Sequence, residues 1–363
     1  MAVHPELLQI DGSIGEGGGQ VLRTCLTMSM LTGRAFRIRN IRAGRSKPGL
    51  LAQHLKAVDA AVAISNAHVE GAYLGATCLL FEPHEIRSGR YKFDIGTAGS
   101  VSLLFQTVFL PLSRASAGSS LIITGGTHVP WSPSFHFLQQ QYLNLLNKIG
   151  FDAQIKLVQA GYYPQGRGRL DAHIRPCKEI VPLKLLERGE LVRISGICAV
   201  SNLRKDIAER QKRQIVGRLS KLNWITLKDP LQIKVLELDS SVKGTFSFLH
   251  AQFENGCFGY TSLGELGKPA EQVADEAVEA FISFYQSSAS IDQYLADQLL
   301  LPLCLAEGNS EYSTSQVTQH LMTNAEVIRL FLPVKILISG DLGASGVVYI
   351  YPDSSHVKDN PSP

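Results

Sequence analysis

The stretch YKFDIGTAGSVSLLFQTVFLPLSRASAGSSLIITGG, residues 91–126, predicts a strand, a helix and a second strand in close succession. Tyr91–Ile95 alternates aromatic or apolar residues with polar ones, as a half-buried strand does. Gly99–Leu112 has the length and apolar content of a buried helix, and the strand Ser120–Thr124 ends at a glycine pair. The stretch is therefore typical of an α/β unit.

The same unit continues downstream and is repeated on both sides. A second helix and two strands complete it at Ser134–Ile149, Ala153–Val158 and Leu170–Ile174. An earlier copy predicts strands and helices at Leu7–Asp11, Gly19–Leu31, Phe36–Ile38, Leu50–Ile64, His68–Gly71 and Thr77–Phe81. A later copy covers Gln293–Ala306, Tyr312–Ser315, Thr323–Leu330, Val334–Ile338 and Gly346–Ile350. The pattern predicts an α/β (α+β) fold of three repeated βαβαββ-type modules, with the helices on one face of each sheet.

Residues 186–286 do not follow the repeated pattern of strands and helices and are predicted to be an inserted α+β domain. A basic helix follows the strand Leu191–Val200, and three more strands precede the acidic helix Ala270–Tyr285. Residues 1–185 and 287–351 would then form the repeated-module core, with 352–363 as a frayed tail. The cations of the basic helix are Arg204, Lys205, Arg210, Lys212, Arg213 and Arg218. They either extend a binding surface for RNA or are simply exposed to solvent.

Composition excludes a disordered protein and a membrane protein. The chain has 363 residues, of which 45% are hydrophobic and 18% charged, and its net charge is +3. No apolar stretch is long enough to cross a bilayer, and His4, Glu6 and Asp11 stand where a signal peptide would need apolar residues. The six cysteines form no CxxC pair, so we expect buried free thiols and a cytoplasmic protein.

The turn GEGGGQ at residues 15–20 joins a predicted strand to a helix that carries Arg23. Its glycines would let backbone amides approach an anion at the helix N-terminus, although a simple tight turn is the alternative. It lacks the Rossmann and Walker signatures. Glu16 in this turn is a candidate ligand for a hard metal ion.

Arg42, Arg45 and Lys47 follow a predicted strand end and precede a predicted helix. Guanidinium groups at the tip of a sheet match phosphate best, whereas a solvated face is the alternative. Near the C-terminus, His320 stands before a predicted helix and could act as a nucleophile towards phosphorus, or be an ordinary surface residue. Tyr294 and Asp297 are three residues apart on one helix, with Gln298 beside them, and could clamp a nucleobase or form a polar flank.

Seven segments in this order resemble the RNA 3′-terminal phosphate cyclase family over nearly the whole chain. The segments are GEGGGQ with Arg23, RAGRSKPGL, FDIGTAGSVSLLFQ, GGTHVP, LGELGKPAEQV, YLADQ and HLMTN. The resemblance implies three βαβαββ repeats with an inserted α+β domain. It also implies that a histidine takes AMP from ATP, that AMP passes to an RNA 3′-phosphate, and that the 2′-hydroxyl then closes a 2′,3′-cyclic phosphate.

The resemblance assigns roles to residues of this chain. His320 matches the nucleophile, and Glu16 matches a ligand of a divalent metal, Mg or Mn. The nucleotide pocket is matched by Gln106, Pro133, Tyr294, Asp297 and Gln298, with Tyr294 and Pro133 expected on either side of the adenine. Contacts to phosphates or to the RNA end are matched by Arg23, Arg42, Arg45 and Gln53. This chain departs from the family pattern at His128, at Ser134-Phe135-His136 and at Arg167.

Two other functions compete with this one. The first is a cyclase-like binding protein of ribosome assembly, which lacks the histidine nucleophile. The presence of His320 in this chain argues against that class. Enolpyruvyl transferases are built from similar repeated modules, so a small-molecule transferase is the second alternative. The oligomeric state, the physiological RNA and any activity on 5′-phosphates are left open.

Overall fold

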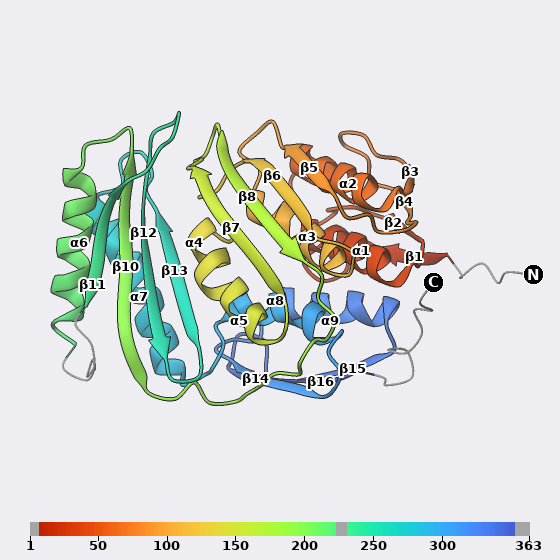
Figure 1. The fold of residues 1–363 in the computed structure, drawn as a ribbon. Coiled ribbons are helices and arrows are strands. Elements are labelled where there is room, and N and C mark those ends of the chain that lie inside the picture. Colours follow the sequence, from red (N-terminus) through yellow and green to blue (C-terminus); the bar gives the residue numbers. More distant parts are fainter. Residues whose placement is uncertain (1–6, 223–230, 353–363) are drawn as a thin grey trace, which may run out of the picture.

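The computed structural model describes residues 7–222 and 231–352, which form four four-stranded sheets (Figure 1). Module one comprises β1 (Leu8–Asp11), α1 (Gly19–Thr32), β2 (Phe36–Arg39), α2 (Ala52–Ser65), β3 (His68–Glu70) and β4 (Leu79–Glu82). Module two comprises β5 (Arg90–Asp94), α3 (Val101–Ser113), β6 (Ser119–Gly125), α4 (Phe135–Phe137), a π-helical turn (Leu138–Tyr142), α5 (Leu143–Lys148), β7 (Asp152–Gln159) and β8 (Gly168–Arg175). Module three comprises β9 (Lys184–Leu185), α8 (Gln293–Leu303), β14 (Ser310–Thr314), α9 (Gln319–Phe331), β15 (Val334–Ser339) and β16 (Gly346–Pro352).

The three modules share one topology, so the predicted fold class is confirmed. Their strand orders are β1-β2-β4-β3, β5-β6-β8-β7 and β9-β14-β16-β15. In each module the first two strands are parallel and the other pairings are antiparallel. A helix must connect the parallel pair, which explains the alternation of strand and helix along the chain.

The segment between β9 and α8 forms the fourth sheet and two helices. It contains β10 (Leu191–Ser201), α6 (Asp206–Leu219), β11 (Gln232–Glu237), β12 (Gly244–Phe253), β13 (Cys257–Leu263) and α7 (Ala270–Ser287), with strand order β11-β10-β12-β13. A buried cluster of its own lies between the sheet and the two helices, with Ile194, Ile215 and Phe281 among its members. On the opposite face, Phe246 and Phe248 of β12 join the core of the modules. This segment therefore packs directly against module two.

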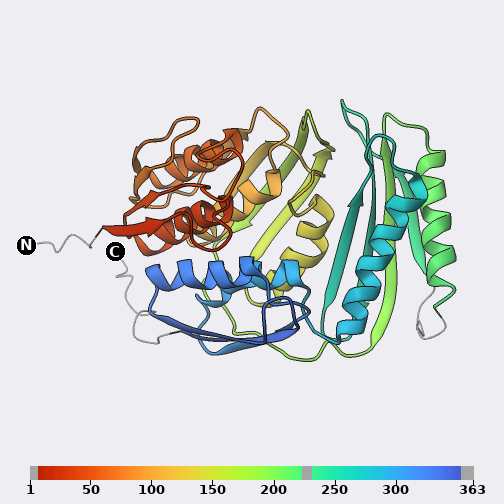
Figure 2. The ribbon, with the colours of Figure 1, turned by 180° about the vertical axis from the view of Figure 1, so that it is seen from behind.

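Helices of the modules face one another and the sheets lie outside them. Helix α1 packs against α2, α3 and α9, and α8 packs against α9. Figure 2 shows α8 and α9 lying between the sheet of module three and the other modules. None of the helices in the described parts of the chain has the length and apolarity that a bilayer span requires.

Four details differ from the sequence-based expectations. Strand β9 was missed because two residues are too few to show a period, yet it supplies the parallel partner of β14. The helix predicted over 134–149 is interrupted by the π-helical turn. Helix α9 begins at Gln319, before the predicted start, because the Thr318 hydroxyl accepts a hydrogen bond from the Leu321 amide and caps it. All six cysteines are free, but Cys78 is exposed and Cys257 is only partly buried. The tail predicted over 352–363 lies outside the described residues, apart from its first residue.

Candidate active site

Seven of the predicted site residues, together with Gln20, lie in the first two turns of five helices that pack together, whereas Glu16, Arg42, Arg45 and Pro133 lie in loops. Gln20 and Arg23 are on α1, Gln53 on α2, and His320 on α9. Gln106 lies on α3, and Tyr294, Asp297 and Gln298 lie on α8. Helix N-termini carry partial positive charge and free amides, so their convergence creates a region suited to anions.

His320 is held by contacts on both ring nitrogens. Its Nδ1 lies 2.5 Å from Gln20 Oε1, and its Nε2 lies 3.1 Å from Glu16 Oε2. The other end of the Gln20 amide, Nε2, donates to Asp297 Oδ2 at 2.8 Å. Because that bond turns Gln20 Oε1 towards the imidazole, Nδ1 must be the protonated nitrogen that donates to it. The contact of Nε2 with the Glu16 carboxylate is attractive only while Nε2 is protonated as well, and loss of that proton leaves the lone pair on Nε2, on the side of Glu16.

Glu16 connects His320 to the cationic loop of module one. Its Oε2 accepts a hydrogen bond from Arg45 Nη2 at 3.0 Å, and both side chains are partly exposed. The structure thus brings together Glu16, Gln20, Arg45, Asp297 and His320, which lie up to 304 residues apart in the sequence (320 − 16). The candidate nucleophile and the glycine turn form one site.

The glycines of the turn are required by close approach. A Cβ at Gly15 would lie 1.9 Å from Thr323 Oγ1, and the φ of +61° at this position is also unfavourable for other residues. A Cβ at Gly19 would lie 2.3 Å from His54 Nε2. Only glycine therefore lets the turn lie against α9 and α2, which places Glu16 beside His320.

Burial shifts the proton affinities of the site. It lowers the pKa of His320, with Glu16 opposing the shift and Arg23 and Arg45 reinforcing it. Burial, and then the charge of Asp292, raises the pKa of Asp297 to about 7, while Arg23 opposes the rise. Burial lowers the pKa of Arg23 to about 10, against the attraction of Asp297. These environments favour a neutral imidazole at neutral pH.

Arg23 and Arg42 are placed differently from one another. The Arg23 guanidinium forms no hydrogen bond and no ion pair with any residue that the structure describes, so it is available to an anion. Arg42 is buried, and its Nη1 donates to the carbonyl oxygens of Lys47 at 2.6 Å and Gly49 at 2.8 Å. Arg42 therefore fixes the loop that carries Arg45.

The residues predicted for the nucleotide form a second group on α8 and α3. Gln106 Nε2 donates to Gln298 Oε1 at 2.5 Å, and Gln298 Nε2 donates to the Tyr294 carbonyl oxygen. Tyr294 is 54% exposed, so its ring has accessible surface on which a base could stack. Asp297 links this group to His320 through Gln20.

Gln53 and Pro133 lie outside these networks. Gln53 packs against Gly99, at the end of the loop between β5 and α3. Pro133 is partly exposed and precedes Ser134, whose hydroxyl lies 2.6 Å from Thr261 Oγ1. Within the described residues, no hydrogen bond or ring contact joins Pro133 to Tyr294.

Sequence analysis missed Gln20, His54 and Asp292. Gln20 belongs to the quoted glycine motif, but its partners Asp297 and His320 become neighbours only in the folded chain. His54 follows Gln53, and its Nδ1 accepts a hydrogen bond from the Leu51 amide. Burial, with Arg23 and Arg42 nearby, lowers the pKa of His54 to about 3, so it presents a neutral Nε2–H beside Gly19. Asp292 caps α8 and is fully buried.

Glu16 fits a divalent cation that is shared with a ligand. No cluster of three or more His, Cys, Asp or Glu residues occurs in the two described segments of the chain. Mg²⁺ is commonly held by one or two carboxylates together with substrate phosphates, and a single Glu16 carboxylate at the edge of an anion site matches that arrangement.

Known proteins resemble this chain over most of its length. Residues 14–338 match the model of a family described as RNA 3′-terminal phosphate cyclase. A protein of that name from Gloeothece citriformis (strain PCC 7424) is 42% identical over 332 residues, 90% of this chain and 93% of that protein. Another of that name, from Archaeoglobus fulgidus (strain ATCC 49558 / DSM 4304 / JCM 9628 / NBRC 100126 / VC-16), is 41% identical over 335 residues, 92% of this chain and 98% of that protein.

Proposed function

The chain belongs to the RNA 3′-terminal phosphate cyclase family, and we propose that it closes RNA 3′-phosphates through an AMP adduct on His320. As in the family, the substrates are RNA and ATP, and the enzyme is of the ligase type. The observation that supports the proposal best is the orientation of His320. Gln20 holds Nδ1 as a donor, so Nε2 is the nitrogen that would attack, once it is deprotonated and Glu16 has turned away from it.

In the first step, the Nε2 lone pair attacks the α-phosphorus of ATP. An N–P bond forms, the bond from phosphorus to the bridging oxygen breaks, and pyrophosphate leaves with that electron pair. The imidazole becomes positively charged while Nδ1–H remains bonded to Gln20, whose amide is in turn bonded to Asp297. Arg23 and Arg45 lie close enough to influence His320 electrostatically and would stabilise the phosphate charge.

In the second step, an oxygen of the RNA 3′-phosphate attacks the same phosphorus and the N–P bond breaks. His320 recovers its lone pair, and the RNA end carries AMP through a pyrophosphate bond. The neighbouring 2′-hydroxyl then attacks the RNA phosphorus, loses its proton and expels AMP. Ring closure is fast because nucleophile and phosphorus belong to the same nucleotide. DNA lacks the 2′-hydroxyl and would stop at the adenylated end.

Glu16 would hold a Mg or Mn ion together with the phosphates of ATP. When bound, such an ion neutralises charge on the transferred phosphate. Tyr294 would stack on the adenine, and Gln106 and Gln298, already bonded to each other, would face the base or ribose. Pro133 is proposed for the second face of the adenine on the strength of the family pattern.

The test is incubation with α-labelled ATP and a divalent metal. We expect wild-type protein to form an acid-labile AMP adduct, and His320→Asn to form none while unfolding at the wild-type temperature. The His320 side chain is 44% exposed, so its replacement should cost little stability. Adduct formation by the variant at the wild-type level would remove His320 from the mechanism.

The same assay separates the alternative functions. We expect a 3′-phosphorylated oligoribonucleotide, but not its 3′-hydroxyl form, to discharge the adduct and release AMP. A wild-type protein that forms no adduct would be a binding protein. An adduct that no RNA end discharges would favour a small-molecule transferase.

A further inference from the structure

Three consecutive residues of β13, in the inserted segment, contact residues around the proposed adenine site. The Gly259 amide donates to Gln141 Oε1 at 2.6 Å. The Tyr260 ring lies edge-on to Tyr294, with centroids 6.0 Å apart and planes at 74°. Thr261 Oγ1 lies 2.6 Å from the hydroxyl of Ser134, the neighbour of Pro133. One strand edge thus reaches both the α8 side and the Pro133 side of the site.

Gln141 joins three parts of the molecule. It lies in the π-helical turn of module two and is 1% exposed. Its Oε1 accepts from Gly259 of the inserted segment, and its Nε2 donates to Asp292 Oδ2 in module three. π-Helical turns re-aim side chains and occur often at functional sites. Here the turn directs a buried amide to the point where module two, the inserted segment and module three meet.

Asp292 transmits this contact to Tyr294. Its Oδ1 accepts hydrogen bonds from the amides of Tyr294 at 2.8 Å and Leu295 at 3.0 Å, so it caps α8. Its other oxygen, bonded to Gln141, fixes the rotation of the carboxylate. The backbone at Tyr294 is therefore held by Asp292, and the Tyr294 ring by Tyr260.

We propose that the inserted segment positions the adenine-binding ring of the enzyme, with Tyr260 and Gln141 as positioning residues for ATP. The inference rests on the proposed placement of the nucleotide at Tyr294. A half-exposed tyrosine samples several rotamers unless a neighbour restricts it, and every rotamer lost on binding weakens affinity. Tyr260 restricts the ring beforehand, and the Gln141–Asp292 pair restricts the backbone that carries it.

Replacement of Tyr260 tests the ring contact. Tyr260→Ala should raise the KM for ATP in self-adenylation about three- to tenfold, the equivalent of one aromatic pair, with kcat and the KM for RNA close to wild type. Tyr260→Phe keeps the ring and should restore the wild-type KM, because the hydroxyl has no hydrogen bond to any described residue. Lys212→Ala, on the exposed side of α6, is the control for an unrelated change in the inserted segment.

A reciprocal exchange tests the buried pair. Gln141→Glu sets two carboxylates against each other, and Asp292→Asn sets two amide NH₂ groups against each other, so each single variant should raise the KM for ATP. The double variant restores one amide and one carboxylate with their positions exchanged, so position 292 donates and position 141 accepts. The exchanged carboxylate can still accept from the Gly259 amide, so the double variant should recover most of the wild-type KM. Thermal unfolding of all three identifies any variant that fails to fold.

The outcomes separate this inference from the proposed function. If wild-type protein forms no AMP adduct, the proposed function fails, and the positioning role that rests on it fails as well. If wild-type protein forms the adduct but folded Tyr260→Ala keeps the wild-type KM for ATP, the positioning role is wrong. Equal increases in KM for ATP and for RNA, or a double variant no better than the singles, would also overturn it.

Discussion

At the scale of single residues, the contact between Gln20 and His320 decides which imidazole nitrogen can react. Gln20 faces Asp297 with its amide nitrogen and His320 with its oxygen, so the tautomer of the ring depends on one rotamer. Helix α1 places Gln20 in its first turn, opposite the first turn of α9. The pairing of these two helix N-termini therefore orients the imidazole that we propose as the nucleophile.

Gln20→Leu removes both hydrogen bonds of this side chain. We expect the rate of self-adenylation at saturating ATP to fall about 10- to 100-fold, the loss that is typical when the residue orienting a metal-binding histidine is removed. The KM for ATP should change little, because Gln20 touches the nucleophile and not the proposed base pocket. Gln154→Leu, on an exposed position of β7, is the control, and a Gln20→Leu rate equal to it would contradict the positioning role.

At the scale of elements, the loop after β2 depends on one buried arginine. Arg42→Ala leaves the carbonyl oxygens of Lys47 and Gly49 without their donor, which should destabilise the fold by about 1–3 kcal/mol. Since the loop carries Arg45, the KM for 3′-phosphorylated RNA should rise as well. Arg42→Lys should not restore either property, because one ammonium does not reproduce the guanidinium fork.

Thermal unfolding and RNA kinetics measure these two effects. Arg39→Ala, at the exposed end of β2, provides the comparison for loss of a nearby charge. An Arg42→Ala protein as stable as Arg39→Ala but defective with RNA would show direct contact between Arg42 and the substrate instead.

The basic helix α6 is largely neutralised by neighbouring acids. Arg210 pairs with Glu271, and Arg218 with Asp275 and Glu279, all on α7. Arg204 and Lys205 pair with Asp206 and Glu237. In the part of the chain that the structure describes, Lys212 and Arg213 are the cations of this set without an ion pair within 4 Å. The helix also lies on the side of the inserted segment away from the modules (Figure 1).

Removing the charges of Lys212 and Arg213 should therefore leave RNA use unchanged. We expect the KM for a 3′-phosphorylated oligoribonucleotide and its salt dependence to match wild type in the double alanine variant. Arg45→Ala should instead weaken RNA or ATP use about 10- to 100-fold, the equivalent of a lost charge-assisted hydrogen bond. A reduced salt dependence in the double variant would instead place RNA on α6.

At the scale of the whole molecule, order along the chain could be predicted and contacts across it could not. Hydrophobic periodicity located nearly every helix and strand, since alternation and helical spacing are local properties. Two-residue β9 carries no period, and the π-helical turn differs from an α-helix only in its hydrogen bonds. Motif order selected His320 and Glu16 as candidates, and the fold places their side chains 3.1 Å apart. The bonds of Gln20 to Asp297 and of Gln141 to Asp292 span 277 and 151 residues, so only the fold places these partners together.

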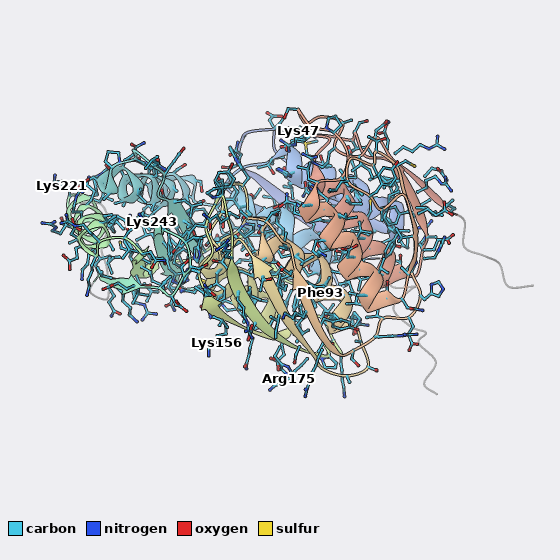
Figure 3. The ribbon with its side chains drawn as sticks, turned by 90° about the horizontal axis from the view of Figure 1, so that it is seen from above. Lys47, Phe93, Lys156, Arg175, Lys221 and Lys243 are labelled. Atoms are coloured by element: carbon cyan, nitrogen blue, oxygen red, sulfur yellow. The ribbon has the colours of Figure 1, made fainter. Side chains whose placement is uncertain are left out.

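The boundary between module two and the inserted segment is built on a pair of buried histidines. His128 Nε2 lies 3.0 Å from His136 Nδ1; the His128 ring stacks on Phe246 of β12, and the His136 ring packs against Phe246 at a tilt of 39°. Figure 3 shows from above how the inserted segment lies beside module two: Lys243 is on its nearer side and Lys221 at its far end. Burial lowers the pKa of His136 to about 4 and that of His128 as well, with His136 adding to the effect on His128. Both rings are therefore neutral in the folded protein at neutral pH.

Acid should weaken the folded state through this pair. The unfolded chain protonates His136 below its ordinary pKa of 6.5, whereas the folded chain resists until about pH 4, so stability is fully present above pH 6.5 and falls as the pH drops between these values. From pH 7.5 to pH 5 the loss from His136 alone is about 2 kcal/mol in the free energy of unfolding. Asp292 and Asp297, whose pKa values are raised, act in the opposite direction, but they are common to wild type and variants and cancel in the comparison. In denaturant unfolding, His136→Gln should therefore lose about 2 kcal/mol less than wild type over this pH range, while His68→Gln, at an exposed site, should follow wild type. Parallel pH profiles for wild type and His136→Gln would show that protonation of this boundary does not govern acid stability.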